Sequence, residues 1–268
     1  MAADAKELSF WDHLEELRWR LLRIIVYIVV AAAASWIFRE QMLDILRYPA
    51  EVGAVMAGEE QFEFRIFEAA GGFILMMQIA LVAGLIIASP GAIIEMWLFV
   101  EPALEKHERK WVILVVPLAV LLFLGGVVFC YWISPRAFAF FLRFNRSMGV
   151  EVELTLQPYL FFLMRLLLVF GIAFELPLVL TFLSAVGIVT KKQLISWWRH
   201  AVLAIFIFAA IATPTTDPAT MSFMAGPMVA LYFLSVWLAG LFEKKEDAEE
   251  RVGSDEDEPE TAGEQDEG

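Results

Sequence analysis

The chain has 268 residues, 60% of them hydrophobic, with a mean hydropathy of +0.67, whereas a soluble domain is about half apolar, so a water-soluble globular protein is excluded. The formal net charge is −13, but residues 243–268 carry thirteen acidic and three basic side chains, which leaves only −3 for the remainder. One cysteine, Cys130, excludes an intrachain disulfide, and the three histidines lack metal spacing, so we expect no metal, no cofactor and no nucleic-acid partner.

Residues 1–20 are polar and charged and lead directly into the first apolar run. We expect a cytoplasmic, amphipathic segment here rather than a cleavable signal peptide. The stretch HLEELRWRLL at 13–22 predicts a helix that continues into the first span. Glu16 and Arg20 lie four residues apart in it, which is a favourable spacing for an ion pair on a helix. A solvated, self-paired helix start is the alternative interpretation.

Six apolar segments predict transmembrane helices, since crossing the hydrocarbon core takes roughly 20 apolar residues. They are 21–38, 72–94, 111–133, 160–186, 201–213 and 219–242. The fifth segment is short, so it is either a span in a locally thinned bilayer or part of a re-entrant hairpin. The sequence therefore predicts an all-α polytopic membrane protein with one membrane domain over residues 21–242.

Lysine and arginine set the expected orientation, because cytoplasmic loops are enriched in them. With the N-terminus inside, the inner segments hold thirteen of these residues and the outer segments hold six, with Arg165 inside a span. Six spans then place both termini in the cytoplasm. Residues 243–268 have almost no apolar side chains, so we expect a disordered acidic cytoplasmic tail, with an interaction tail as the alternative.

The first inner loop carries the stretch FVEPALEKHERK at 99–110. Pro102 can open a helix. Glu101, Glu105 and Glu108 then fall on one helical face, at spacings of four and three. This acidic stripe is either a recognition surface or a mixed-charge surface helix.

Glu175 lies in an apolar run, and Pro177 follows two positions later. A carboxylate at membrane depth is costly, so it marks a functional site by default. Proline removes a backbone donor and kinks the helix, which predicts a bend beside the charge. Asp217, in the last outer loop, is consistent with a cap on the sixth span. Arg165 is too far along the helix to pair with Glu175 and is expected to extend toward the outer surface.

Four segments together resemble the TatC family, the core subunit of the twin-arginine protein translocase. They are HLEELRWRLL at 13–22, SPGAIIEMWLFVEPALEKHERK at 89–110, FGIAFELP at 170–177 and TPTTDP at 213–218. They occur in the family's order, and the resemblance covers roughly residues 10–242. It implies six helices in a curved, cup-shaped bundle with both termini cytoplasmic, in a bacterial inner membrane.

The resemblance also implies roles for residues that match the family's motifs. Glu16 and Glu108 match the carboxylates that recognise the arginine pair of a signal peptide, and Arg18 and Phe99 match positions important for that site. Glu175, beside Pro177, matches an intramembrane glutamate linked to contact with partner subunits. Further matched positions are Pro49, Pro90, Glu101, His107, Arg109 and Asp217.

The partners implied by the resemblance are the single-span proteins TatA and TatB, twin-arginine signal peptides of folded cargo, the lipid bilayer and further copies of the chain. Transport would be driven by the proton motive force, and no enzymatic activity is expected. Three positions depart from the family pattern: Glu95 and Met221 stand where relatives have glutamine, and Phe233 where a polar or acidic residue is frequent.

Two other classes of function are alternatives to this one. A proton-coupled small-solute transporter would use Glu175 as its proton relay, but transporters often contain internal repeats, and the sequence shows none. An intramembrane protease would need a Ser–His or paired-Asp centre within the spans. The three histidines lie outside the spans or at their edges, and Asp217 is a lone acid in a loop.

Overall fold

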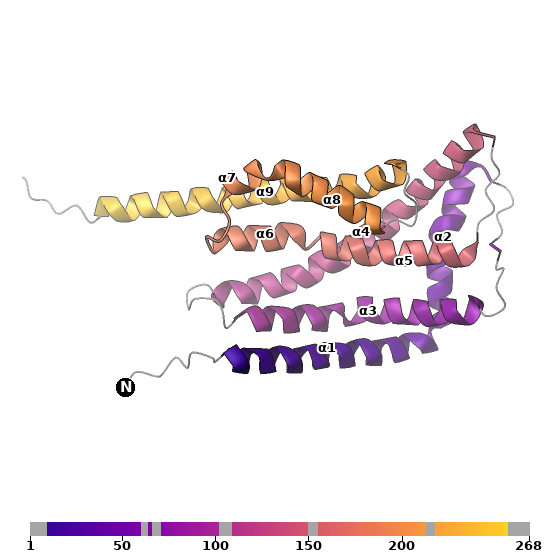
Figure 1. Ribbon diagram of the computed structural model, residues 1–268, viewed down its shortest axis with the longest axis horizontal. Helices are drawn as coiled ribbons and strands as arrows, with labels where there is room; N and C mark the ends of the chain where they lie inside the picture. The colour runs from indigo at the N-terminus through magenta and orange to yellow at the C-terminus, as the bar shows by residue number, and fades with distance from the viewer. Residues whose placement is uncertain are drawn as a thin grey trace, which may run out of the picture.

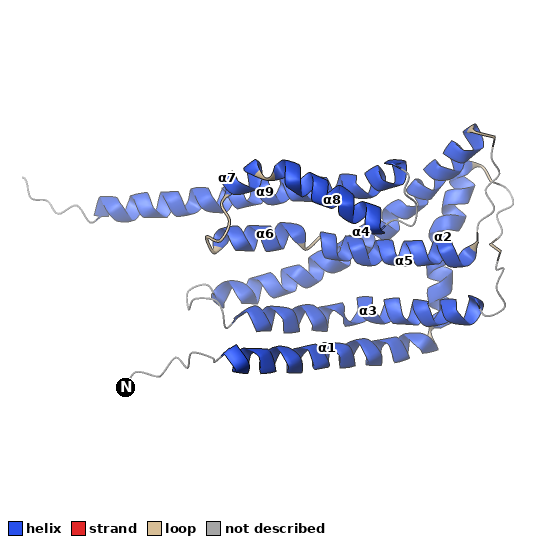
Figure 2. Cartoon of the chain, viewed as in Figure 1, coloured by secondary structure: helices blue, strands red, loops and turns tan. Residues whose placement is uncertain are grey.

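The computed structural model describes residues 10–59, 64–65, 71–101, 109–149, 155–212 and 218–256, and this part of the chain is built from helices (Figure 2). One isolated bridge, between Arg65 and Thr155, is its only extended pairing. The helices are α1 Phe10–Ile37, α2 Arg39–Ala57, α3 Gly71–Val100, α4 Arg109–Ser147, α5 Leu156–Ala173, α6 Leu176–Ala185, α7 Lys191–Ser196, α8 Trp198–Ala212 and α9 Pro218–Glu256. The all-α prediction is confirmed.

Five stretches of helix are long and apolar enough to cross a membrane: His13–Ile37, Gly71–Val100, Val115–Ser147, Leu156–Ala185 and Met221–Gly240. The shorter apolar helix Trp198–Ile211 accounts for the remaining predicted span. Most helices extend beyond the apolar runs that predicted them, because polar residues that flank a span can continue the helix outside the hydrocarbon. The positions of the six spans were thus predicted correctly, but their lengths were underestimated.

The long helices lie side by side, with α4 crossing the array diagonally (Figure 1). Helix α1 packs on α3, α4 on α5, and α6 on α9. The start of α1 and the end of α9 lie at the same end of the bundle, and α2 crosses the opposite end (Figure 1). Helix α8 runs beside α9 and stops short of the level that α3 and α5 reach (Figure 1).

Helix α2 packs on α4 through a face of small residues. Its buried positions are Pro49, Ala50, Gly53, Ala54 and Ala57. Helix α2 ends at Gly58, which adopts the left-handed conformation with φ 83°. The guanidinium of Arg146 donates to the carbonyl of Ala57 at 2.9 Å, which satisfies a carbonyl that has no partner within its own helix. Pro49, a family-matched position, therefore lies in a helix–helix contact.

The acidic tail differs in part from the prediction of disorder. Helix α9 continues through its first half to Glu256, whereas residues 257–268 lie outside the described part of the chain. Alanine, glutamate and lysine favour the helix, and a helix that has already formed propagates at little cost. The tail has too few apolar side chains to form a packed core, but its charged residues still permit α9 to continue as an exposed helix.

Helices α1 and α3 approach each other most closely at Gly84. A Cβ atom at this position would lie 2.6 Å from the backbone nitrogen and from the Cα of Ala32. Small residues let helices in a membrane approach backbone to backbone, where van der Waals packing holds them together. Because α1 makes only minor contacts with other described helices, its position depends on this contact with α3.

We expect Gly84→Ala to destabilise the protein, because the added methyl group would meet backbone atoms that have no room to move. Overpacking of this kind costs about 1–3 kcal/mol. The matched control is Gly125→Ala in the interior of α4, where a Cβ has open space within 4 Å. Thermal unfolding in detergent should show a lower midpoint for the Gly84 variant only; equal midpoints would contradict the close approach.

Candidate functional site

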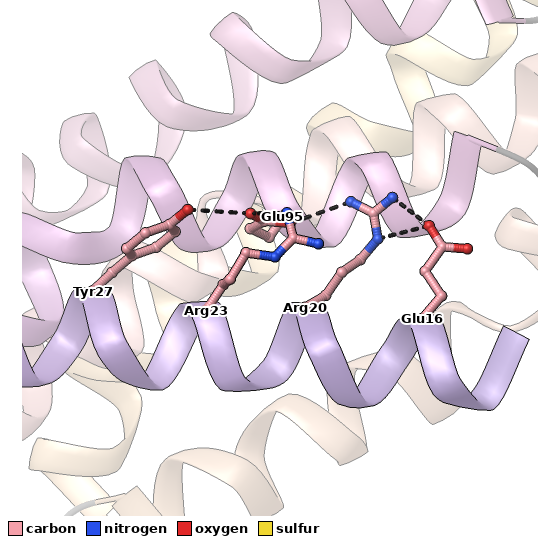
Figure 3. Close-up of polar contacts among 5 residues, drawn as sticks. All are labelled: Glu16, Arg20, Arg23, Tyr27 and Glu95. Carbon is pink, nitrogen blue, oxygen red and sulfur yellow. Dashed lines mark hydrogen bonds and ion pairs between the residues drawn. The ribbon is translucent and has the colours of Figure 1, made fainter.

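One face of α1 carries a row of polar side chains toward α3. The row consists of Glu16, Arg20, Arg23 and Tyr27. The last three point toward Glu95 on α3, and Glu16 lies at the end of the row beside Arg20 (Figure 3). Steps of four, three and four residues keep side chains on the same side of an α-helix, one above the other. The sequence of α1 therefore presents charge to α3 along a stripe that lies among apolar residues.

Glu95 is the centre of this group. Its side chain is only 6% exposed, and its Oε1 atom accepts hydrogen bonds from Nη1 of Arg23 at 2.9 Å and from the hydroxyl of Tyr27 at 3.2 Å. Its Oε2 atom accepts from Nη1 of Arg20 at 3.2 Å. Both oxygens of a buried carboxylate are thus hydrogen-bonded to cations, which is what burial of a charge requires.

Arg20 bridges two carboxylates. Its Nε donates to Oε1 of Glu16 at 2.9 Å, and its Nη2 contacts the same oxygen. This confirms the predicted pairing of Glu16 with Arg20, and it adds a contact to Glu95, 75 residues away in the sequence. The four ionised groups, two acids and two bases, balance in charge.

Aromatic stacking joins α1 to the end of α3. The ring of His13 stacks on that of Phe99, with centroids 4.3 Å apart and 16° between planes. Arg18 is exposed, 3.6 Å from the carboxylate of Glu15 and with its guanidinium 5.4 Å from the ring centre of Trp19. The structure therefore brings Glu16 and Phe99 to the same end of the bundle and leaves Arg18 on the surface of α1.

Other residues predicted for this site are only partly covered. Helix α3 ends at Val100, and Glu101, half-buried, follows it in a short turn. Pro102, Glu105, His107 and Glu108 lie outside the described residues, as does Asp217. Arg109 begins α4, and its side chain lies outside the described part. Pro90 lies within α3, which continues through it as a helix.

The predicted bend at Glu175 is present. Helix α5 ends at Ala173, and α6 begins at Leu176, with Pro177 in its first turn. Glu175 thus lies in a break between two helices, where proline cannot supply the backbone donor of a continuous helix. The Oε1 atom of Glu175 is buried and has no hydrogen-bond partner within the described part of the chain. A buried, unsatisfied polar atom calls for an explanation.

Close packing holds this break in place. A Cβ at Gly126 of α4 would lie 2.5 Å from the carbonyl oxygen of Phe170 and 2.9 Å from the ring of Phe174. The side chain of Pro177 is buried as well. Arg165, earlier in α5, has its guanidinium 4.8 Å from the ring centre of Phe161. The glutamate is therefore fixed between rigid helices.

Sequence reasoning missed the pairing of Glu95 with α1. In the sequence, Glu95 stands out only as a departure from the family pattern, and Arg23 is one of the basic residues counted for the inner side. The spacing of Glu16, Arg20, Arg23 and Tyr27 along one helix face was the available signal, but the sequence did not show which helix that face meets. Within the described part of the chain, no group of three or more His, Cys, Asp or Glu side chains could hold a metal ion.

The chain resembles known proteins over most of its length. A family model described as Sec-independent protein translocase protein (TatC) matches residues 12–227. The Sec-independent protein translocase protein TatC of Koribacter versatilis is 36% identical over 241 residues, covering 90% of this chain and 88% of that protein. The chloroplastic TatC of Arabidopsis thaliana is 31% identical, covering 89% of this chain and 68% of that protein.

The fold also matches a solved structure. The crystal structure of a protein titled twin arginine translocase receptor TatC superposes with a TM-score of 0.77 at 32% identity, covering 86% of this chain and 99% of that one. The six-span reading of the sequence agrees with this match. None of the comparisons supports a small-solute transporter that uses Glu175 as a proton relay.

Proposed function

The chain belongs to the TatC family of Sec-independent protein translocase proteins, and we propose that it is the subunit that receives twin-arginine signal peptides. It is a multi-pass membrane protein and a component of a protein translocase. The proposed site is on the cytoplasmic face of a bacterial inner membrane, with both termini on that face and residues 243–268 as a cytoplasmic tail.

One observation carries this proposal. Glu16 of α1 and Phe99 at the end of α3 lie at the same end of the bundle, joined through the stacking of His13 on Phe99. Glu108 lies outside the described residues, directly before the start of α4 at Arg109 in the sequence. Two motifs that are about 80 residues apart in the sequence thus meet at one edge, where a peptide could reach both.

The chemistry suits a pair of arginines. A guanidinium presents five donors in a rigid plane and can bind a carboxylate with two parallel hydrogen bonds. Glu16 and Glu108 are assigned one guanidinium each, with Phe99 and the exposed Arg18 flanking the site. Lysine carries its charge at a single ammonium group and is a poor substitute for this geometry. Two separated carboxylates can therefore distinguish an arginine pair from a lysine pair.

Glu175 is assigned to partner contact. It is too deep in the bundle to touch the arginine pair, and its Oε1 atom has no partner among the described residues. The residue as a whole is only half-buried, so rotation of its side chain would bring the carboxylate to a polar side chain on a single-span protein of the TatA or TatB type. Such hydrogen bonds in lipid contribute roughly 1 kcal/mol, enough to bias docking but not to drive assembly alone. Assembly of several copies and use of the proton motive force belong to the same proposal.

We expect Glu16→Gln and Glu108→Gln each to weaken binding of a twin-arginine signal peptide by about ten-fold or more. Each charge-assisted hydrogen bond contributes roughly 1.5–3 kcal/mol, and the neutral amide cannot replace it. The measurement is photocrosslinking in membranes from a probe at position 99 to a labelled peptide, alongside its dissociation constant, because a probe at position 16 or 108 would itself replace the carboxylate under test.

A twin-lysine peptide is the control ligand, and Glu40→Gln, on the exposed surface of α2 at the opposite end of the bundle, is the control variant. Equal crosslinking of the twin-arginine and twin-lysine peptides would mean that Glu16 and Glu108 are ordinary surface charges. Undiminished crosslinking in a chain that carries both Glu16→Gln and Glu108→Gln would also contradict the assignment of these two carboxylates to the arginine pair.

We expect Glu175→Leu to reduce crosslinks from α6 and α8 to the single-span partners, because leucine removes the acceptor. Glu175→Gln keeps a carbonyl acceptor at the same place and should retain most of the crosslinks. Signal-peptide binding at the cytoplasmic face should not change in either variant. Unchanged partner crosslinks with leucine would remove Glu175 from the contact.

A further inference from the structure

The carboxylate proposed to bind a peptide arginine already binds an arginine of the same chain. Arg20 engages Oε1 of Glu16 through both Nε, at 2.9 Å, and Nη2 (Figure 3). Two nitrogens on one carboxylate resemble the contact expected of a guest guanidinium. The side chain of Glu16 is 26% exposed, so a guest can reach it from solvent.

Arg20 has a second acceptor behind it. Its Nη1 atom lies 3.2 Å from Oε2 of Glu95, whose side chain is 6% exposed. Arg23 and Tyr27 bind the other oxygen, at 2.9 Å and 3.2 Å, so they fix the carboxylate without occupying Oε2. Arg20 can therefore release Glu16 and still keep an ionic partner.

We propose that Arg20 is a built-in competitor for the peptide arginine and that Glu95 is the acceptor that holds Arg20 once a guest displaces it from Glu16. This inference rests on the proposed function and adds two positioning residues to its site. Binding is then an exchange: the guest guanidinium takes Oε1 of Glu16, and Arg20 remains on Glu95.

Charge both opposes and supports the exchange. Glu16, Glu95, Arg20 and Arg23 sum to zero before a guest arrives, and a guest arginine adds one positive charge that repels Arg20. A buried carboxylate is little screened by salt or water, so the attraction of Glu95 for Arg20 offsets part of this repulsion.

The competitor lowers the affinity of every guest by the same factor, because each guest pays the same cost of displacing Arg20 from Glu16. The preference for arginine over lysine is set by the guest's own contact with Glu16, where a lysine offers a single ammonium group. Arg20 therefore tunes how strongly the site binds a guest, and not which guest it prefers.

The test measures dissociation constants of labelled twin-arginine and twin-lysine peptides for the full chain in nanodiscs. Arg20→Gln should tighten twin-arginine and twin-lysine binding by the same factor, about five-fold, so that the ratio of the two dissociation constants stays the same. Glu95→Gln should weaken twin-arginine binding about five-fold, since Arg20 is then left with Glu16 as its only carboxylate. In the double variant the loss caused by Glu95→Gln should disappear.

The sign of the Arg20→Gln effect separates this idea from a merely structural ion pair. If Glu95 only ties α3 to α1, Glu95→Gln and Arg20→Gln will both lose affinity, and the double variant will lose little more than either, because all three break the same pair. Weaker binding with Arg20→Gln, or an equal loss from Glu95→Gln with and without Arg20, would overturn the proposal. Arg39→Gln removes the same charge at the opposite end and should change neither affinity.

Two further measurements keep the outcome decisive. If Arg20→Gln lowers the thermal midpoint in detergent, Arg20→Lys replaces it; lysine keeps the charge but competes less well, so binding should still tighten. A wild-type chain that binds both peptides equally would remove the proposed function itself. A wild-type chain that discriminates and loses affinity with Glu16→Gln, but gains none with either Arg20 variant, would remove only this inference.

Discussion

Glu95 can stay charged inside the apolar end of α3 only because α1 supplies two guanidiniums and a phenol hydroxyl. An ion in such surroundings costs several kcal/mol unless its oxygens are hydrogen-bonded to cations. This requirement fixes how α1 is rotated, since Arg20, Arg23 and Tyr27 must all face α3. The rotation in turn places Glu16 at the edge of the bundle and His13 against Phe99. The position of Glu16, the proposed receptor carboxylate, therefore depends on the pairing of Glu95 with side chains that lie about one to three helical turns further along α1.

The chain treats its second intramembrane carboxylate in the opposite way. Glu175 lies in a break that Pro177 enforces, and Gly126 brings α4 close enough to hold the neighbouring backbone. No described side chain binds its Oε1 atom. A satisfied carboxylate such as Glu95 stabilises contacts within one molecule, whereas an unsatisfied one on a rigid frame favours contact with another molecule. The two glutamates thus suit different tasks because their surroundings differ, not their chemistry.

Most of the fold could be predicted from the sequence, because each span is an apolar run of near-membrane length. The bend at Glu175 was predictable as well, since proline acts locally. The contact between Glu95 and Arg20 was not, because it joins residues 75 positions apart and nothing in α1 says which helix its polar face meets. The helical continuation of α9 to Glu256 was missed for another reason: charged residues oppose a packed core but favour an exposed helix.

The end of the bundle proposed as the receptor would also have to meet two opposed demands on charge. Insertion with this end in the cytoplasm, as proposed, needs arginines next to the first span, and Arg18, Arg20 and Arg23 are available for this. Recognition of an arginine pair needs free negative charge at the same place. Acidic residues affect topology little, so they can be added without reversing the orientation. Arg23 pairs with the buried Glu95, and Arg20 would stay paired with it once a guest has displaced Arg20 from Glu16. The arginines can therefore direct insertion and still leave Glu16 available to a guest.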